Sequence, residues 1–176
     1  MLFRSDAGAY KRYKDMNCFA PFKKMYGQKV RDWNTGKILG LSIVNEAGEE
    51  IPDTIYGCDY ETKGLNPEIE NSETCVAIPA LKGKSVLMVD DIISYGGTFY
   101  YSALKLNKMG PDNIFAYATH TEPKSLWNKE KGTFIKSFGF DGNRRDHIKQ
   151  IVEKLYTTDS IYNLESNDFV NVQKCF

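Results

Sequence analysis

The sequence predicts an α/β fold in which a mainly parallel central sheet is flanked by helices. Residues 86–89 are four apolar residues in a row, β-branched at both ends, which is typical of a strand buried on both faces. Residues 99–109 follow with apolar side chains at helical spacing and stop at Gly110-Pro111. Residues 114–119 are again apolar. This alternation of strand, helix and strand indicates a parallel sheet with helices on both faces.

The bulk composition indicates one domain and excludes some classes of partner. The 176 residues, 41% of them hydrophobic, are enough for one domain, 1–176, with its own core. The formal net charge is zero, and no apolar run is long enough to cross a membrane. We therefore expect neither a nucleic-acid nor a membrane partner. The four cysteines are widely spaced and form no metal-ligand pattern, which favours free thiols and a cytoplasmic location.

Charge is unevenly distributed along the chain. Residues 1–37 hold nine Lys/Arg and three Asp/Glu, whereas residues 45–73 hold one Lys and nine Asp/Glu. The basic opening segment is suited to attracting a polyphosphate, and an ordinary solvated surface explains it equally well.

The chain opens on a short strand at residues 1–3, followed by a turn of small residues at 6–9. Residues 10–14 are helix-like. A turn of this kind can wrap a diphosphate with its backbone N–H groups, and Asp6 would then hold a magnesium ion on that diphosphate. Without further information such a turn is more often only a turn.

Residues 22–32 and 38–44 are strand-like, and the turn at 34–37 joins them into a hairpin that spans about 22–45. Lys29 and Arg31 are two positions apart, so on a strand they lie on one face. Two cations on a projecting, mobile hairpin can stabilise the charge of a transferring phosphoryl group. Two solvated strand residues are the alternative.

The rest of the sequence offers weaker chemical signals. Residues 45–72 are acidic and rich in turns, and we assign them no chemical role. His120 ends a strand, where a lone histidine is more often structural than catalytic. The other expected elements are short apolar runs at 55–58 and 74–80, a short helix at 125–131, a strand-like segment at 133–138, an amphipathic helix at 148–155, and strands at 157–161 and 169–173.

The segment 90–98 carries the clearest chemical signal. Asp90 and Asp91 come at the carboxyl end of the central strand, where open α/β sheets bind ligands. The turn that follows has two glycines, which allow several N–H groups to converge at a helix N-terminus, and three hydroxyl side chains. Such a turn suits a phosphate monoester, and the two carboxylates suit vicinal hydroxyls or a hydrated magnesium ion. The residues of the turn are Ser94, Tyr95, Gly96, Gly97 and Thr98.

Residues 86–98 resemble the phosphoribosyl-diphosphate binding loop of the type I phosphoribosyltransferase family. Further segments are similar to the ribose-phosphate pyrophosphokinase branch of that family. They are the Ser5-Asp6-Ala7-Gly8-Ala9 segment, the Lys29-Val30-Arg31 triplet, and, in order, the segments at 81–84, 116–120 and 157–161. The resemblance spans nearly the whole chain outside 45–75.

The resemblance implies a type I phosphoribosyltransferase-like fold and a transferase of nucleotide biosynthesis that uses Mg²⁺. It implies that residues 90–98 bind ribose 5-phosphate or phosphoribosyl diphosphate. It also implies that Lys29 and Arg31 are catalytic, and that Asp6, Ala7 and Gly8 bind diphosphate, with Asp6 also at the metal. An assembly of identical chains is expected, because members of the family form dimers or larger rings.

Two departures from the family pattern limit this interpretation. Tyr95 stands where the loop commonly has threonine, and its bulk narrows the pocket or adds a donor. Ribose-phosphate pyrophosphokinases are longer proteins of two similar halves, and every matched segment belongs to the carboxyl-terminal half. We therefore expect the ATP-binding half to be absent from this chain.

Three functions follow as hypotheses. The first is a ribose-phosphate pyrophosphokinase-like domain, whose complete form transfers diphosphate from ATP to ribose 5-phosphate and which is inactive or only partly active as this chain. The second is a phosphoribosyltransferase that makes a nucleotide from phosphoribosyl diphosphate. The third is a non-catalytic regulatory or binding subunit that keeps the sugar-phosphate pocket.

Overall fold

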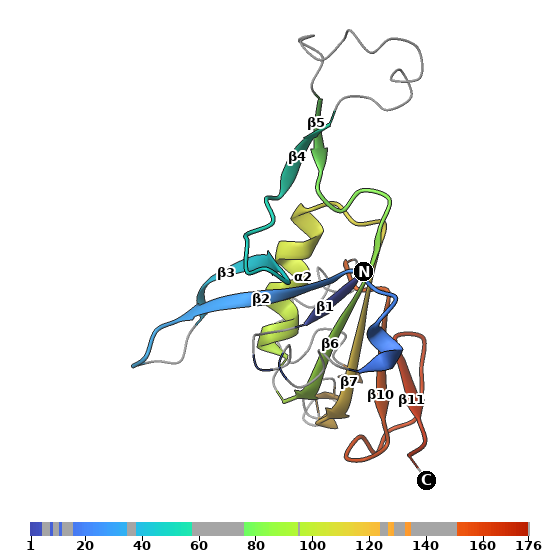
Figure 1. Cartoon of the computed structure of the whole chain (residues 1–176). Helices are drawn as coiled ribbons and strands as arrows, with labels where there is room; N and C mark the ends of the chain where they lie inside the picture. Colours follow the sequence, from blue (N-terminus) through green and yellow to red (C-terminus); the bar gives the residue numbers. More distant parts are fainter. Residues whose placement is uncertain are drawn as a thin grey trace, which may run out of the picture.

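The structure is a computed structural model, which describes residues 1–4, 8, 11, 16–34, 38–57, 76–94, 96–123, 127–128, 133–134 and 151–175. Within these residues the largest element is a seven-stranded sheet of order β11-β10-β7-β6-β1-β2-β3 (Figure 1). Its strands, in chain order, are β1 (Leu2–Arg4), β2 (Lys24–Arg31), β3 (Ile38–Asn45), β6 (Ser85–Ile93), β7 (Asn113–Thr121), β10 (Lys154–Thr158) and β11 (Val170–Gln173).

The sheet is parallel except at one edge. The pairs β2–β1, β1–β6, β6–β7, β7–β10 and β10–β11 are parallel, and β3 pairs antiparallel with β2. The short β1 lies between β6 and β2, with Phe3 opposite both Met88 and Met25. The predicted fold class, a mainly parallel sheet with a projecting hairpin, is confirmed.

The central strand is longer than its apolar run. Residues 86–89 lie in β6 as predicted, but the strand continues through Asp90 and Asp91 to Ile93. The reason is the neighbouring strand, because β7 pairs with Asp90, Ile92 and Ile93, the last of them opposite Thr121. Tertiary pairing therefore extends the strand past the point where the sequence pattern changes.

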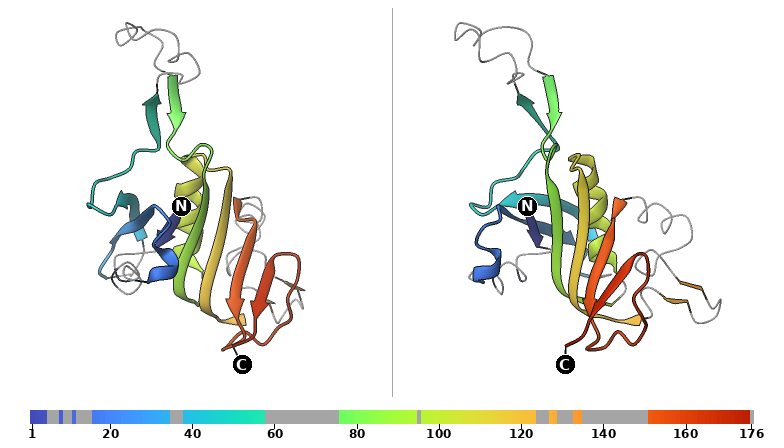
Figure 2. Two further views of the ribbon diagram at one scale, coloured as in Figure 1. Left: turned by 45° about the vertical axis from the view of Figure 1, so that its right-hand side comes forward. Right: turned by 90° about the vertical axis from the view of Figure 1, so that its right-hand side faces the viewer.

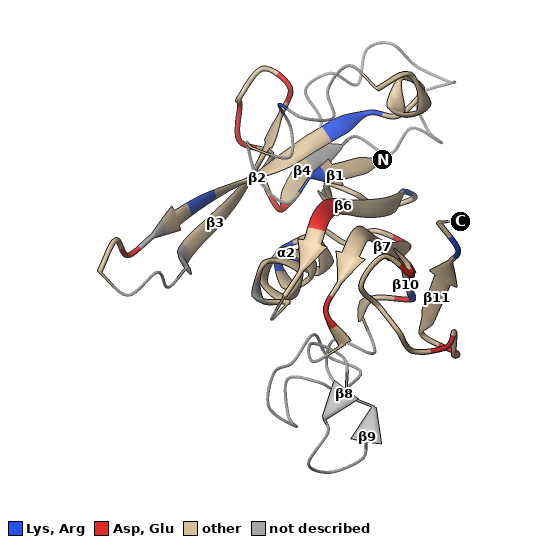
Figure 3. Cartoon of the chain, turned by 90° about the horizontal axis from the view of Figure 1, so that it is seen from below, with Lys and Arg blue, Asp and Glu red and all other residues tan. Residues whose placement is uncertain are grey.

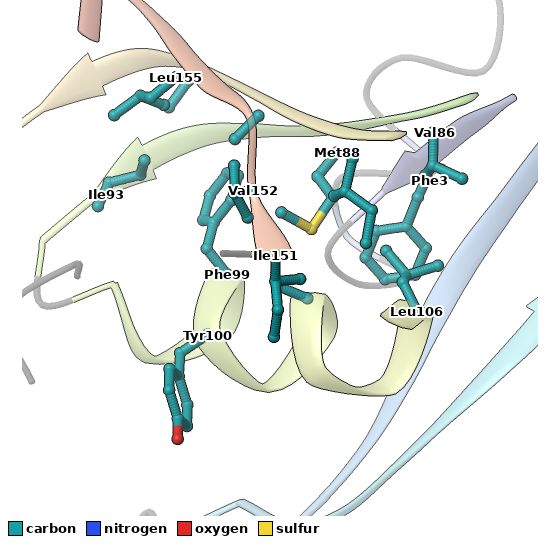
Figure 4. Packing of buried hydrophobic residues seen from close by; sticks show 14 of the residues in the cluster. Phe3, Val86, Met88, Ile93, Phe99, Tyr100, Leu106, Ile151, Val152 and Leu155 are labelled. Atoms are coloured by element: carbon teal, nitrogen blue, oxygen red, sulfur yellow. The ribbon is translucent and has the colours of Figure 1, made fainter. Parts of the chain in front are cut away.

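Helix α2 (Gly97–Lys108) packs on one face of the sheet and forms the main core with it (Figure 4). Phe99, Ala103 and Leu106 are buried against the alternate residues of β6 that include Val86 and Met88. After the helix the chain turns at a glycine with a φ of +65°, at position 110. The helix and its glycine stop agree with the sequence prediction.

On the opposite face of the sheet, the described residues form the 3-10 turn η1 (Asn17–Phe19). A helix on this face stays a prediction. A cavity of about 320 Å³ lies between the η1 segment and the sheet. It is lined by Met16, Cys18, Phe19, Leu87, Val89, Tyr117 and Thr119. No described helix is both long enough and apolar enough to span a bilayer.

Two hairpin-like projections extend from the sheet (Figure 2). The predicted hairpin is β2 with β3. The second projection pairs β4 (Thr54–Gly57) antiparallel with β5 (Val76–Pro79), in the region to which the sequence assigned no role. The base of this second projection is fixed to the body by an ion pair of 2.7 Å between Lys105 of α2 and Asp53. The described parts of the predicted apolar runs at 55–58 and 74–80 thus lie in or directly after a two-stranded arm, formed by β4 and β5.

Two helix predictions are wrong. Trp127–Asn128, inside the predicted helix 125–131, forms β8 and pairs with β9 (Thr133–Phe134). The predicted helix 148–155 ends early, because Leu155 lies in β10 and only Ile151 is helical among the residues described there. The predicted strand 157–161 is correspondingly shifted, since β10 ends at Thr158. Ile151 and Leu155 are nevertheless buried, because both periodicities place them inward.

Other sequence expectations fall partly outside the described residues. His147 and Ile148 lie there, as do Cys58 and Cys75. Cys18 and Cys175 are exposed and free, in line with the thiols expected from their spacing. The strand predicted at 169–173 is confirmed as β11.

Tyr162 is a buried phenol whose hydroxyl oxygen finds no hydrogen-bond partner among the described residues. Burial raises the pKa of this phenol above its ordinary value of 10.0. We predict that Tyr162→Phe increases the free energy of unfolding by about 1 kcal/mol at neutral pH, because an unsatisfied buried polar group is removed.

The pH dependence gives the same substitution a second measurement. Because the folded-state pKa is raised, the stability linked to this proton is complete below pH 10.0 and is lost as the pH rises through the folded pKa. The free energy of unfolding, measured with urea, should therefore fall more steeply above pH 10.0 for the wild type than for the Phe variant. A less stable Phe variant at neutral pH would contradict the prediction.

Gly110 and Gly83 form a matched pair of glycines with positive φ. At Gly110 a Cβ atom would lie 2.5 Å from Cβ of Pro79, whereas at Gly83 nothing lies within 4 Å. We predict that Gly83→Ala costs about 1 kcal/mol from backbone strain alone, and that Gly110→Ala costs roughly 2 kcal/mol more because the base of the arm must shift. Thermal unfolding of both variants measures the difference, and equal losses would contradict it.

Candidate functional site

The candidate site lies at the edge of the sheet where β6, β7 and β10 end. Parallel strands bring their carboxyl ends to one edge, so the side chains that follow them gather there. Figure 3 views this edge, with acidic residues on β6 and at the end of β7, and basic residues on β2, which lies on the other side of β1 from β6. The predicted loop 90–98 runs from this edge into α2.

The two consecutive carboxylates have different environments. Asp90 is 8% exposed, and its Oδ1 accepts the backbone N–H of Asp91 at 2.9 Å. Asp91 is half-buried. Because neighbouring residues of a strand project to opposite faces, the two side chains diverge, and Asp91 is the more accessible to a ligand.

The turn after β6 forces the chain into a conformation that favours glycine. Gly96 is buried and has a φ of +74°, and α2 begins at the next residue. Its carbonyl accepts the N–H of Tyr100 at 2.9 Å, which closes the first turn. The first N–H groups of a helix have no partner inside the helix and carry partial positive charge, so this turn presents donors to an anion. Tyr95 lies outside the described residues, and for Gly97 only the backbone is described.

The predicted hairpin contacts the predicted loop. Nζ of Lys29, on β2, donates a hydrogen bond of 3.3 Å to Oγ1 of Thr98 in the first turn of α2. The structure therefore brings together two candidate residues that are 69 positions apart in the sequence. Arg31 lies at the end of β2, and its side chain is not described.

The predicted diphosphate segment is largely outside the described residues. Asp6 and Ala7 lie outside them, and Gly8 is described only as exposed and helical. Their placement relative to the loop therefore stays a prediction.

Glu122 is a residue at this edge that the sequence analysis missed. Its Oε2 accepts the hydroxyl of Ser94 at 3.0 Å, and its N–H donates to the carbonyl of Ile93 at 2.9 Å. The available signal was its position, directly after a buried strand that runs parallel to β6. Carboxyl-end residues of neighbouring strands meet, whatever their distance along the chain.

Hydroxyl groups join the ends of β7 and β10 behind the loop. Oγ1 of Thr157 donates to Oγ1 of Thr121 at 2.8 Å, and both residues are fully buried. His120 and Ser160 hydrogen-bond through Nδ1 and Oγ at 2.7 Å. His120 thus makes a hydrogen bond of the structural kind that the sequence suggested.

The sequence resemblance implies a magnesium ion, for which carboxylate oxygens are the expected protein ligands. Within them, no three His, Cys, Asp or Glu side chains gather closely enough to hold a metal ion. Asp90 and Asp91 offer carboxylate oxygens beside the loop, and Asp6 lies outside the described residues. A magnesium site built from protein side chains alone is therefore not described here.

The sequence comparisons point to one kind of protein. No family model matches the chain. Ribose-phosphate pyrophosphokinase of Vibrio parahaemolyticus is 32% identical over 96 residues, which are 54% of this chain and 25% of that protein. The enzymes of the same name from Pyrococcus furiosus and Thermococcus kodakarensis are 40% and 44% identical over 70 residues, 38% of this chain and 24% of each protein. The matches thus span about a quarter of the length of these relatives.

The structural comparison supports the same fold over nearly the whole chain. The crystal structure of phosphoribosylpyrophosphate synthetase from Mycobacterium smegmatis superposes with a TM-score of 0.53 and 13% sequence identity. The similarity covers 98% of this chain and 40% of that one. At this identity the likeness shows a shared fold.

The hydrogen bond between the buried Thr121 and Thr157 should make a measurable contribution to the free energy of unfolding. We predict that Thr157→Val or Thr121→Val alone costs about 1–2 kcal/mol of unfolding free energy, because each leaves a buried hydroxyl with one partner fewer. The double variant should cost less than the sum of the two, since both hydroxyls are then removed. Denaturant unfolding of the four proteins of this cycle measures the coupling, and strictly additive losses would contradict it.

Proposed function

We propose that this chain binds ribose 5-phosphate or phosphoribosyl diphosphate at residues 90–98, because about half of it is similar to ribose-phosphate pyrophosphokinases and its fold is similar to that of a phosphoribosylpyrophosphate synthetase. In a complete enzyme this site would serve the transfer of diphosphate from ATP to ribose 5-phosphate. The ATP site and the transfer itself belong to the proposal, since the matches cover only part of each relative.

The observation that supports the proposal most directly is the turn at Gly96. Its positive φ turns the chain into α2 only a few residues after the two carboxylates near the carboxyl end of β6. Partly positive N–H groups at one side and acceptor oxygens at the other match a phosphate ester and a ring diol, respectively. Within this pairing Asp91 would take the hydroxyls, since Asp90 is nearly buried.

The charges of the site fit a transfer of this kind. The hairpin approaches the loop through Lys29, and Arg31 follows two positions later on the same strand. In-line transfer of a phosphoryl group needs mainly positioning of the reactants and neutralisation of the developing charge. Cations on the hairpin would neutralise that charge. When bound, Mg²⁺ would neutralise diphosphate charge, with Asp6 as the proposed ligand.

Calorimetry with ribose 5-phosphate, phosphoribosyl diphosphate and ATP, each with magnesium, tests the proposal. We expect binding of ribose 5-phosphate, and weakening of at least about tenfold in Asp91→Asn and in Gly97→Val, which corresponds to roughly 1.4 kcal/mol. Asp168→Asn, an exposed carboxylate after β10, should leave the affinity unchanged.

The outcomes separate the hypotheses. Formation of AMP from ATP and ribose 5-phosphate would establish the complete activity, whereas sugar-phosphate binding alone would favour a partial or regulatory domain. Tight binding of phosphoribosyl diphosphate with base-dependent release of diphosphate would replace the proposal by a nucleotide-forming phosphoribosyltransferase. Unchanged affinity in both site variants would remove the site from residues 90–98.

A further inference from the structure

We propose that two oppositely charged side chains, Lys29 and Glu122, set the phosphate affinity of the loop with opposite signs. Lys29 raises it through Thr98, and Glu122 lowers it through Ser94. This inference rests on the proposed function, because it concerns the same phosphate-binding loop, and it assigns roles that the sequence pattern does not give.

The two contacts differ in the direction of the hydrogen bond. Lys29 donates to Oγ1 of Thr98, so the threonine acts as acceptor and its own hydroxyl hydrogen stays available for an anion. Ser94 instead donates to Oε2 of Glu122, so its hydroxyl hydrogen is used within the protein. Thr98 can thus donate its hydroxyl hydrogen to a phosphate directly. Ser94 can do so only after its hydrogen bond to Glu122 breaks.

The charges act in the same directions as the hydrogen bonds. The ammonium group of Lys29 lies 3.3 Å from a hydroxyl in the first turn of α2, next to the N–H groups that would hold the phosphate. An anion bound there would make a charge-assisted contact with it. The carboxylate of Glu122 is fixed close to the other end of the loop, because its own N–H is bonded to Ile93, and it repels a bound dianion.

Lys29 therefore has a role in binding besides the transition-state role expected from the sequence. An ammonium that contacts the phosphate monoester in the bound substrate changes the dissociation constant of ribose 5-phosphate. A residue that acts only on the transferring group changes the rate and leaves that dissociation constant alone. The two roles are thus separable by binding measurements on a non-reacting ligand.

The test is calorimetric titration of the full chain with ribose 5-phosphate and, separately, with inorganic phosphate, at two salt concentrations. We expect Lys29→Met to weaken both ligands about tenfold or more and to reduce the salt dependence of binding. Glu122→Gln should tighten both ligands by roughly three- to tenfold, since its amide oxygen still accepts the Ser94 hydroxyl while the negative charge is gone. Lys29→Arg should retain most of the affinity, because it keeps the charge.

Lys24→Met is the matched control, because Lys24 lies on the same strand and pairs with Glu46 at 3.7 Å, away from the loop. It should leave both affinities unchanged. Misfolding does not mimic the expected pattern, because a damaged loop weakens binding in every variant and cannot tighten it in Glu122→Gln.

The outcomes distinguish this inference from the proposed function. Unchanged affinity in Lys29→Met, or weaker binding in Glu122→Gln, would overturn the inference while leaving ribose 5-phosphate as the ligand. If the wild type binds inorganic phosphate but not ribose 5-phosphate, the proposed function fails, and opposite shifts in the two variants would still support the inference. Binding of neither ligand by the wild type overturns both.

Discussion

The constraint on which the rest of the structure depends is the reversal of the chain between β6 and α2. The strand is buried in the middle of the sheet and the helix packs back over it, so the connection must be short and must turn sharply. Gly96, with a φ of +74°, supplies that turn. The same residue sets where α2 begins, and the first N–H groups of a helix have no partner inside that helix. One glycine therefore serves both the fold and the anion site that we propose.

The surroundings of the loop are built from strands that are distant in sequence. Glu122 directly follows β7, and Lys29 lies on β2, in a hairpin on the far side of β1. A hydrogen-bonded threonine pair, Thr121 with Thr157, ties the neighbouring strand ends together. Side chains from elsewhere in the sheet thus contact the loop at both ends. The hydroxyl of Thr98 contacts the positive Lys29, and the hydroxyl of Ser94 contacts the negative Glu122. The binding properties of the loop depend on the whole sheet edge and not on residues 90–98 alone.

Much of the fold was predictable because its strongest patterns are local. The buried strand, the helix after it and the next strand follow from runs of apolar residues and from their spacing, and the hairpin follows from two extended segments around a turn. The wrong helix prediction at 148–155 occurs where helical and strand periodicity place the same residues inward. Ile151 and Leu155 are four positions apart and lie inward in either state, so the pattern favours a helix, whereas pairing of β10 between β7 and β11 makes Leu155 part of a strand. The two short segments of the β4–β5 arm were expected, but their pairing was not, because a long acidic segment separates them in the sequence.

The sequence by itself determined the α/β class and the position of the loop, and it suggested the ligand that we propose, because these depend on a contiguous stretch whose chemistry and backbone requirements are local. Only the tertiary structure decided that Asp90 is nearly buried while Asp91 is accessible, that Lys29 contacts Thr98, and that Glu122 takes the hydroxyl of Ser94. These features depend on which strands are neighbours and on the register in which they pair. A linear pattern does not contain that information, since the order of strands in the sheet differs from their order in the chain.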